Sequence, residues 1–119
     1  MAKILLLGME QTLADELGRI LRQLGQTVRV EPKGSDLQKS TDADVIFTSA
    51  ALLPAALAAR ADLPVIVVSR TPEVRDWLDA LQDGAADYCG APFEPMQLRW
   101  ILNSVKPVRA MTAHAVSAA

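Results

Sequence analysis

Side chains that could do chemistry fall mainly just after short apolar segments of the chain. Glu10 follows the first of these segments, Ser49 follows the third and Ser69 follows the fourth. A hydroxyl acts as a nucleophile only when a base lies beside it, and a metal site needs several carboxylate, imidazole or thiolate ligands. The only histidine, His114, lies in an alanine-rich C-terminal stretch as a lone imidazole. The pattern therefore predicts no catalytic group and no set of metal ligands.

Gly8, Thr48 and Cys89 each have a chemical interpretation and a simpler structural one. Gly8 follows an apolar segment, but residues 9–13 contain no further glycine, so the G-x-G-x-x-G spacing of dinucleotide-binding loops is absent. A strand-end hydroxyl such as that of Thr48 or Ser49 more commonly bonds to nearby backbone than accepts a phosphoryl group. Cys89, the only cysteine, has no lysine near it, which favours a buried thiol over a reactive thiolate.

The elements that must position these residues alternate regularly between strand and helix. Short apolar runs predict strands at 4–7, 28–30, 45–47, 65–68 and 88–89, and amphipathic segments predict helices at 12–24, 35–39, 52–61, 72–83 and 96–105. This alternation with short connections predicts a single α/β domain, a (βα)5 doubly wound parallel sheet in the flavodoxin-like strand order 2-1-3-4-5. We expect this domain to span residues 1–106, followed by the alanine-rich tail 107–119.

In such a sheet any site lies at the carboxyl ends of the strands. The strand ends there would bring together four short segments, which are 8–11, 48–50, 69–70 and 90–92. The topology therefore predicts one pocket that gathers Glu10, Ser49 and Ser69.

Three segments resemble the receiver domains (CheY-like) of bacterial response regulators. They are Lys3–Leu7, Gly84–Tyr88 and Pro92–Pro95, and the likeness covers about residues 3–105. In that family a histidine kinase supplies a phosphoryl group to an aspartate at the end of the third strand. An acidic pair after the first strand holds Mg²⁺, and a hydroxyl and a lysine after the last two strands contact the phosphoryl oxygens.

Most of these family positions hold a different residue in this chain. The acidic pair falls on Gly8 and Met9, which offer no side-chain carboxylate to Mg²⁺. The phosphoacceptor falls on Ser49 and the lysine on Ala91, so only the hydroxyl survives, as Ser69. The expected degenerate pocket comprises Gly8, Met9, Glu10, Ser49, Ser69 and Ala91. The resemblance is thus to a pseudo-receiver that lacks the phosphoacceptor aspartate and holds no metal or cofactor.

A weaker likeness concerns the segment Asp44–Ser49 and the short second and third helical segments, 35–39 and 50–61. These features are similar to the pseudo-receivers of amidase-type antitermination regulators. In those regulators the domain binds a ligand-sensing partner, and a separate helical domain binds RNA. This likeness also implies a role in recognition.

The helix expected at 72–83 has an apolar stripe and an acidic stripe. At about 100° per residue, one face carries Val74, Trp77, Leu78 and Leu81. We therefore expect Trp77 in the core. The other face carries Asp76, Asp79 and Asp83. A solvated face is the simpler explanation of such an acidic stripe, and the edge of a binding surface is the alternative.

The last helix predicts a surface for a partner. Its inward stripe is Leu98, Ile101, Leu102 and Val105, whereas Met96 and Trp100 point the opposite way. Exposed tryptophan and methionine are enriched at interfaces. The resemblance implies that the last strand and its flanking helices form the output face, to which Tyr88 reports phosphorylation in active relatives. The expected interface comprises Tyr88, Met96, Trp100, Asp76, Asp79 and Asp83. A broader buried face that covers Trp100 is the alternative.

Composition excludes several classes of partner. The chain has 119 residues and a net charge of −2, with 12 basic residues in no run and 4% aromatic residues, which predicts no direct contact with nucleic acid. No apolar stretch approaches the roughly 20 residues of a membrane span, and the start shows no signal-peptide pattern. A single cysteine suits a reducing compartment. We expect a cytoplasmic protein.

These observations predict a protein that is not an enzyme. We expect an interaction or dimerisation module in bacterial signal transduction or transcription control, with a protein partner or a second copy as its target. One alternative is a receiver modified unconventionally at Ser49 or Ser69. Another is a small-molecule sensor that uses the strand-end pocket.

Overall fold

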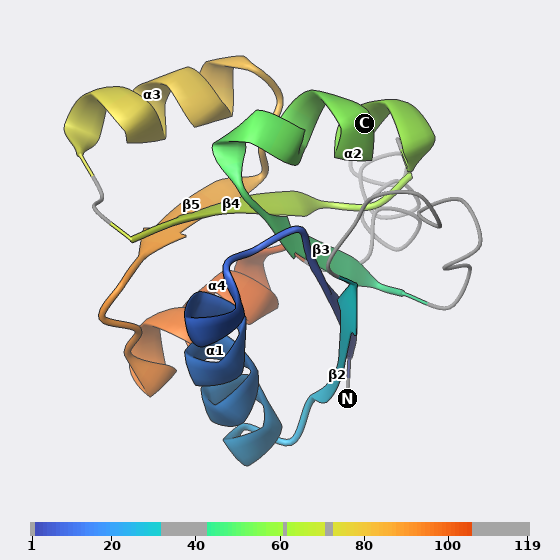
Figure 1. Cartoon of the computed structure of the whole chain (residues 1–119), viewed down its shortest axis with the longest axis vertical. Helices are drawn as coiled ribbons and strands as arrows, with labels where there is room; N and C mark the ends of the chain where they lie inside the picture. Colours follow the sequence, from blue (N-terminus) through green and yellow to red (C-terminus); the bar gives the residue numbers. More distant parts are fainter. Residues whose placement is uncertain (1, 32–42, 61, 71–72, 106–119) are drawn as a thin grey trace, which may run out of the picture.

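A five-stranded parallel sheet forms the centre of the computed structural model, which describes residues 2–31, 43–60, 62–70 and 73–105 (Figure 1). The strands are β1 (Lys3–Leu7), β2 (Thr27–Glu31), β3 (Val45–Thr48), β4 (Val65–Ser69) and β5 (Asp87–Gly90). Every neighbouring pair is parallel, and the order is β2-β1-β3-β4-β5. The predicted fold class and strand order are confirmed.

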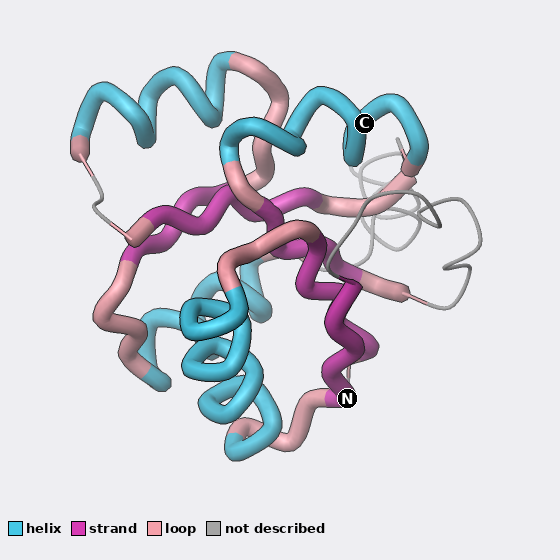
Figure 2. Tube along the Cα trace, viewed as in Figure 1, coloured by secondary structure: helices cyan, strands magenta, loops and turns pink. Residues whose placement is uncertain are grey.

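Helices cover both faces of the sheet. The described helices are α1 (Gln11–Gln23), the short 3₁₀ helix η2 (Ala50–Leu52), α2 (Leu53–Ala59), α3 (Val74–Gln82) and α4 (Pro95–Ser104). Helices α1 and α4 lie on one face, and α2 and α3 lie on the other (Figure 2). The helix expected at 35–39, the domain end at 106 and the tail 107–119 lie outside the described residues. None of the described helices is long and apolar enough to cross a bilayer.

Alternation along the central strands divides the core into two clusters. In β1, Ile4 and Leu6 pack in the cluster under α1 and α4, whereas Leu5 and Leu7 pack in the cluster under α2 and α3. All four side chains are buried. A strand covered on both faces needs apolar residues at every position, because successive side chains point to opposite faces. This explains the uninterrupted apolar run.

A buried side-chain hydrogen bond joins the carboxyl ends of β1 and β3. The hydroxyl of Thr48 donates to the carbonyl oxygen of Leu7 at 2.9 Å, and these two residues are paired in the sheet register. The interpretation of Thr48 as a hydroxyl that bonds to nearby backbone is confirmed. The bond holds together the two strand ends from which the residues Gly8 and Ser49 continue.

The expected orientation of α3 is wrong. Val74, Trp77 and Leu78 are exposed, with 41% of Trp77 accessible, and the buried residue of this helix is Ala80. Ala80 lies one turn after Asp76 and Trp77, between the acidic and the apolar stripe. The helix packs mainly against the edge strand β5. Because no described element covers the outer flank of α3, its apolar stripe faces outward and does not enter the core.

A substitution at Leu17 tests the packing of α1 in the core cluster under α1 and α4. Its side chain is fully buried on α1, so Leu17→Ala should lower the free energy of unfolding by about 3 kcal/mol through lost burial and the cavity left behind. Chemical denaturation would measure this change. The matched control is Gln23→Ala on the exposed side of the same helix, which we expect to change stability by less than about 0.5 kcal/mol. Equal effects of the two substitutions would contradict the described packing of α1.

Candidate functional site

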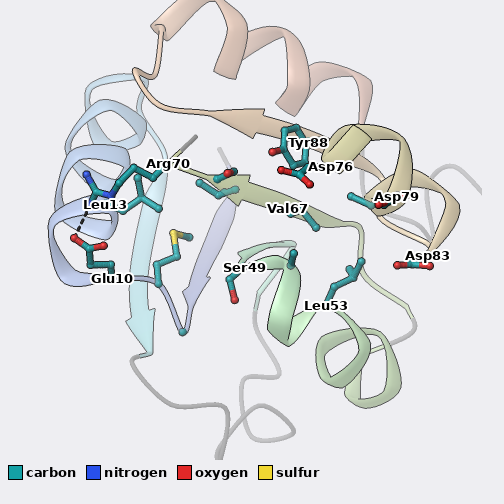
Figure 3. Close-up of a pocket in the computed structure, with 16 residues that line it drawn as sticks. Glu10, Leu13, Ser49, Leu53, Val67, Arg70, Asp76, Asp79, Asp83 and Tyr88 are labelled. Carbon is teal, nitrogen blue, oxygen red and sulfur yellow. Dashed lines mark hydrogen bonds and ion pairs between the residues drawn. The ribbon is translucent and has the colours of Figure 1, made fainter. Parts of the chain in front are cut away.

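A cavity of about 460 Å³ opens at the carboxyl ends of the strands (Figure 3). Its walls include five of the six residues expected in the degenerate pocket, which are Gly8, Met9, Glu10, Ser49 and Ser69. They come from the segment after β1, the segment after β3 and the end of β4. The parallel topology therefore brings together residues that lie up to about 60 positions apart in the chain. Open α/β sheets generally form their sites at this edge.

Ala91 is the expected pocket residue that does not line the cavity. Its side chain packs against the core cluster under α1 and α4, and its backbone N–H donates to the carbonyl oxygen of Ser69 at 3.0 Å. The peptide bond between Ala91 and Pro92 is cis. At this position, where the family carries a lysine, the chain after β5 therefore packs against the core and places no positive charge in the cavity.

The turn after β1 is built around glycine. Gly8 has a φ of 63°, in the left-handed region, and its N–H donates to the carbonyl oxygen of Glu31 at 2.8 Å. Glycine adopts this region without the strain of roughly 1 kcal/mol or more that most other residues would add. No group of three or more His, Cys, Asp or Glu residues in the described segments could hold a metal ion.

An ion pair that the sequence did not suggest lies at one side of the cavity. The guanidinium of Arg70 donates to Glu10 Oε1 at 2.6 Å and joins the segments after β4 and β1 (Figure 3). Both side chains are more than half exposed, so the pair adds at most about 1 kcal/mol to stability. The two residues are 60 positions apart, and β3 lies between their strands. Only the folded arrangement reveals their contact.

Three aspartates form the opposite wall. Asp76, Asp79 and Asp83 line the cavity from α3, which Figure 3 shows beside Val67 and Leu53. We expected these residues on a solvated face or at the edge of a partner surface, and the structure places them on the cavity side of the helix. The cause is the burial of Ala80, because contact through this position directs the acidic stripe to one flank and the apolar stripe to the other.

Tyr88 is buried between two hollows. Only 8% of the residue is exposed, so Tyr88 offers little surface of its own to the interface in which we expected it. Its side chain belongs to the core cluster under α2 and α3 and also lines the strand-end cavity. The phenolic oxygen is buried and finds no hydrogen-bond partner within the described part of the chain. An unsatisfied buried hydroxyl is costly, so it marks a place where a further polar group would be accommodated.

The second hollow is a groove of about 350 Å³ on the other side of Tyr88. It runs between α3, β5 and the start of α4, and Trp77 and Gln97 are among its walls. Met96 and Trp100 are exposed on α4, with 67% of Trp100 accessible. The alternative in which a broader helix face buries Trp100 is therefore wrong.

Cys89 is a buried thiol. The residue is 1% exposed and belongs to the core cluster under α1 and α4. Burial, followed by the nearby negative charge of Asp87, raises the pKa of the Cys89 thiol to about 12. The thiolate is the reactive form of cysteine, so a thiol held in this state is a poor nucleophile at neutral pH. The structural interpretation of this residue is confirmed.

Comparison with known proteins identifies the fold through solved structures. A search of protein-family models finds no match to this chain, and neither does a search of curated proteins. A response regulator receiver domain protein from Clostridium thermocellum superimposes with a TM-score of 0.76 and 17% identity, over 95% of this chain and 98% of that one. The chemotaxis protein CheY4 of Vibrio cholerae gives a TM-score of 0.70 and 20% identity, over 88% of this chain and 98% of that one.

A similar domain also forms part of a longer protein. NtrX from Brucella abortus superimposes with a TM-score of 0.77 and 20% identity, over 98% of this chain and 29% of NtrX. The structural neighbours of the chain are therefore response regulator receiver domains. This finding confirms the CheY-like fold that the sequence resemblance implied.

The pKa of Cys89 predicts a specific dependence of stability on pH. The unfolded thiol ionises near pH 9 and the folded thiol near pH 12, so the folded state holds its proton more tightly. Its contribution is complete below pH 9 and is lost as the pH rises toward 12. Between pH 8 and pH 10 the wild type should lose about 1 kcal/mol more unfolding free energy than Cys89→Ala. Urea denaturation at the two pH values would measure these free energies. An equal loss of unfolding free energy in the wild type and in Cys89→Ala would contradict this prediction.

Proposed function

We propose that this chain is a pseudo-receiver, a receiver-like domain that binds another protein chain and is not phosphorylated on aspartate. The receiver fold of its structural neighbours supports the first part of the proposal. The second part is supported by the residues at the family's functional positions, where Gly8, Met9, Ser49 and Ala91 stand in place of acids and a lysine.

The observation that carries the proposal is an exposed apolar surface on α3 and α4. Of the six large hydrophobic residues that are exposed in the described segments, five lie on these two helices. They are Val74, Trp77, Leu78, Met96 and Trp100, and we call them the α3–α4 surface. An isolated exposed apolar residue is ordinary, but a group of large ones rimmed by polar residues is typical of interaction sites.

The shape of this surface suits a second copy of the chain. Gln97 lines the groove between the helices, and Trp100 lies one turn further along α4 on the same side. The surface therefore carries both a large exposed ring and a groove beside it. An isologous dimer needs the same surface to supply both halves of the contact. We infer that a second copy of the chain binds the α3–α4 surface and forms a homodimer. A different protein is the alternative partner.

Receiver-like architecture also supports a biological setting. Two of the proteins to which this chain is similar are described as a response regulator receiver domain protein and a chemotaxis protein. We therefore place the chain in bacterial signal transduction or transcription control, in the cytoplasm, where it would act by recognition and not by catalysis.

Replacing the tryptophans of the α3–α4 surface tests the dimer. The double variant Trp77→Ser, Trp100→Ser should weaken self-association at least about tenfold, because aromatic residues in an interface contribute most of its binding energy. Sedimentation equilibrium over a range of concentrations would measure this.

The matched control for the dimer is Val30→Ser. Val30 is the remaining large exposed hydrophobic residue of the described segments, and it lies on β2 at the opposite edge of the sheet. This control should leave association unchanged. A wild-type chain that remains monomeric at high concentration would refute the homodimer and favour a different protein as partner.

Phosphorylation can be tested directly. We expect no gain in mass when the chain is incubated with acetyl phosphate and Mg²⁺, under conditions in which an active receiver domain gains one phosphoryl group. Intact-protein mass spectrometry measures the outcome. A phosphoryl group found on an aspartate would overturn the pseudo-receiver proposal, whereas one on Ser49 or Ser69 would support the unconventional modification considered above.

A further inference from the structure

Helix α3 lies at the outside of the molecule and is exposed around most of its circumference (Figure 1). Ala80 is its buried residue, and Leu81 beside it is half-buried. At roughly 100° per residue, the direction opposite Ala80 falls between Leu78 and Gln82. Leu78 is 53% exposed and therefore points almost directly away from the sheet. The outer side of α3 thus has an apolar side chain at its centre.

The acidic flank of α3 also carries a basic residue. Arg75 lies on the same side of Leu78 as Asp79 and Asp83. The three charged side chains are exposed, and none of them forms a salt bridge with another residue of the described segments. Their charges are therefore available to a partner that approaches the outer side of the helix.

The order of these charges is complementary to the same helix running in the opposite direction. If two copies of α3 cross at Leu78, Arg75 of one copy lies level with position 81 of the other. Asp79 and Asp83 of the second copy then lie on either side of that level, each about 3 Å away along the helix axis. A two-fold axis perpendicular to both helices keeps like flanks on the same side. The guanidinium of each copy therefore meets two carboxylates of the other copy.

The apolar flank of α3 fits the same arrangement. Leu78 meets Leu78 of the second copy at the axis, and Val74 falls beside Leu81 of the second copy. Val74 is 70% exposed in the single chain. This contact removes the exposed parts of both apolar side chains from water, which favours association.

We propose that the homodimer forms by antiparallel packing of α3 on α3 about Leu78. Arg75 of each copy lies between Asp79 and Asp83 of the other copy. This inference rests on the homodimer proposed above and specifies the contact at its centre. A surface that pairs with a second copy of itself must carry both halves of each contact, and this flank carries both signs of charge at matching positions.

Exchange of the charges tests the proposal. Arg75→Asp makes the three positions all negative, and the double variant Asp79→Arg, Asp83→Arg makes them all positive. Each variant alone should dimerise at least about tenfold more weakly than the wild type, because like charges then face each other across the axis. Sedimentation equilibrium measures these affinities.

An equal mixture of the two variants provides the matched control. Opposite charges face each other again in the mixed pair, so its affinity should return to within about threefold of the wild type. Native mass spectrometry identifies the heterodimer. Recovery on mixing would not arise from variants that fail to fold.

Leu78→Cys tests the crossing point of the helices. Two thiols at the axis should form a disulfide between copies under mild oxidation, which electrophoresis without reductant detects. The control Gln23→Cys, at an exposed position on α1, should give no comparable covalent dimer. The native Cys89 is buried and does not compete.

The results separate this proposal from the one on which it rests. A wild type that dimerises while both charge variants keep its affinity would overturn the α3 crossing and leave a homodimer through another contact. Failure of the mixture to recover, or equal cross-linking at positions 78 and 23, would also overturn the crossing. A wild type that stays monomeric at high concentration would overturn both proposals.

Discussion

The parallel pairing of β1 with β3 is the contact on which the rest of the molecule depends. Strand β1 lies between β2 and β3 and is buried on both faces, and the Thr48 hydroxyl closes its carboxyl end against Leu7. Because parallel strands end at the same edge, this pairing places the turn at Gly8 beside Ser49 and opens the cavity between α1 and α3. The register that pairs Leu7 with Thr48 therefore fixes the position of the cavity.

Helix α3 and Tyr88 connect the two candidate surfaces. The acidic flank of α3 lines the cavity, and its apolar flank forms part of the α3–α4 surface. Tyr88 lines both the cavity and the groove. A ligand that shifted α3 would change both surfaces at once, because Ala80 provides the helix with only a small buried contact against the sheet. The two candidate surfaces therefore share one helix and one buried side chain.

Much of the candidate site was predictable because it follows from topology. Once the sequence indicated a parallel sheet, residues after β1, β3 and β4 had to meet, and Glu10, Ser49 and Ser69 do so. The pair between Glu10 and Arg70 was not predictable, because its strands are separated by β3 and the contact depends on how two exposed side chains extend. Ala91 follows β5 but turns into the core, which the order of the strands alone does not reveal.

The sequence by itself predicted the fold class and the strand order, because these depend on hydrophobic periodicity and on connection lengths. It left open whether Trp100 is exposed or buried, and the structure shows that it is exposed. Only the tertiary structure decided which flank of α3 meets the sheet. A helical wheel shows two stripes on that helix, and the larger apolar stripe was expected to be buried. At the edge strand β5, the helix instead packs through Ala80, whose small side chain allows close contact. That contact directs the three aspartates of α3 toward the cavity and leaves Trp77 exposed on the other flank of the helix.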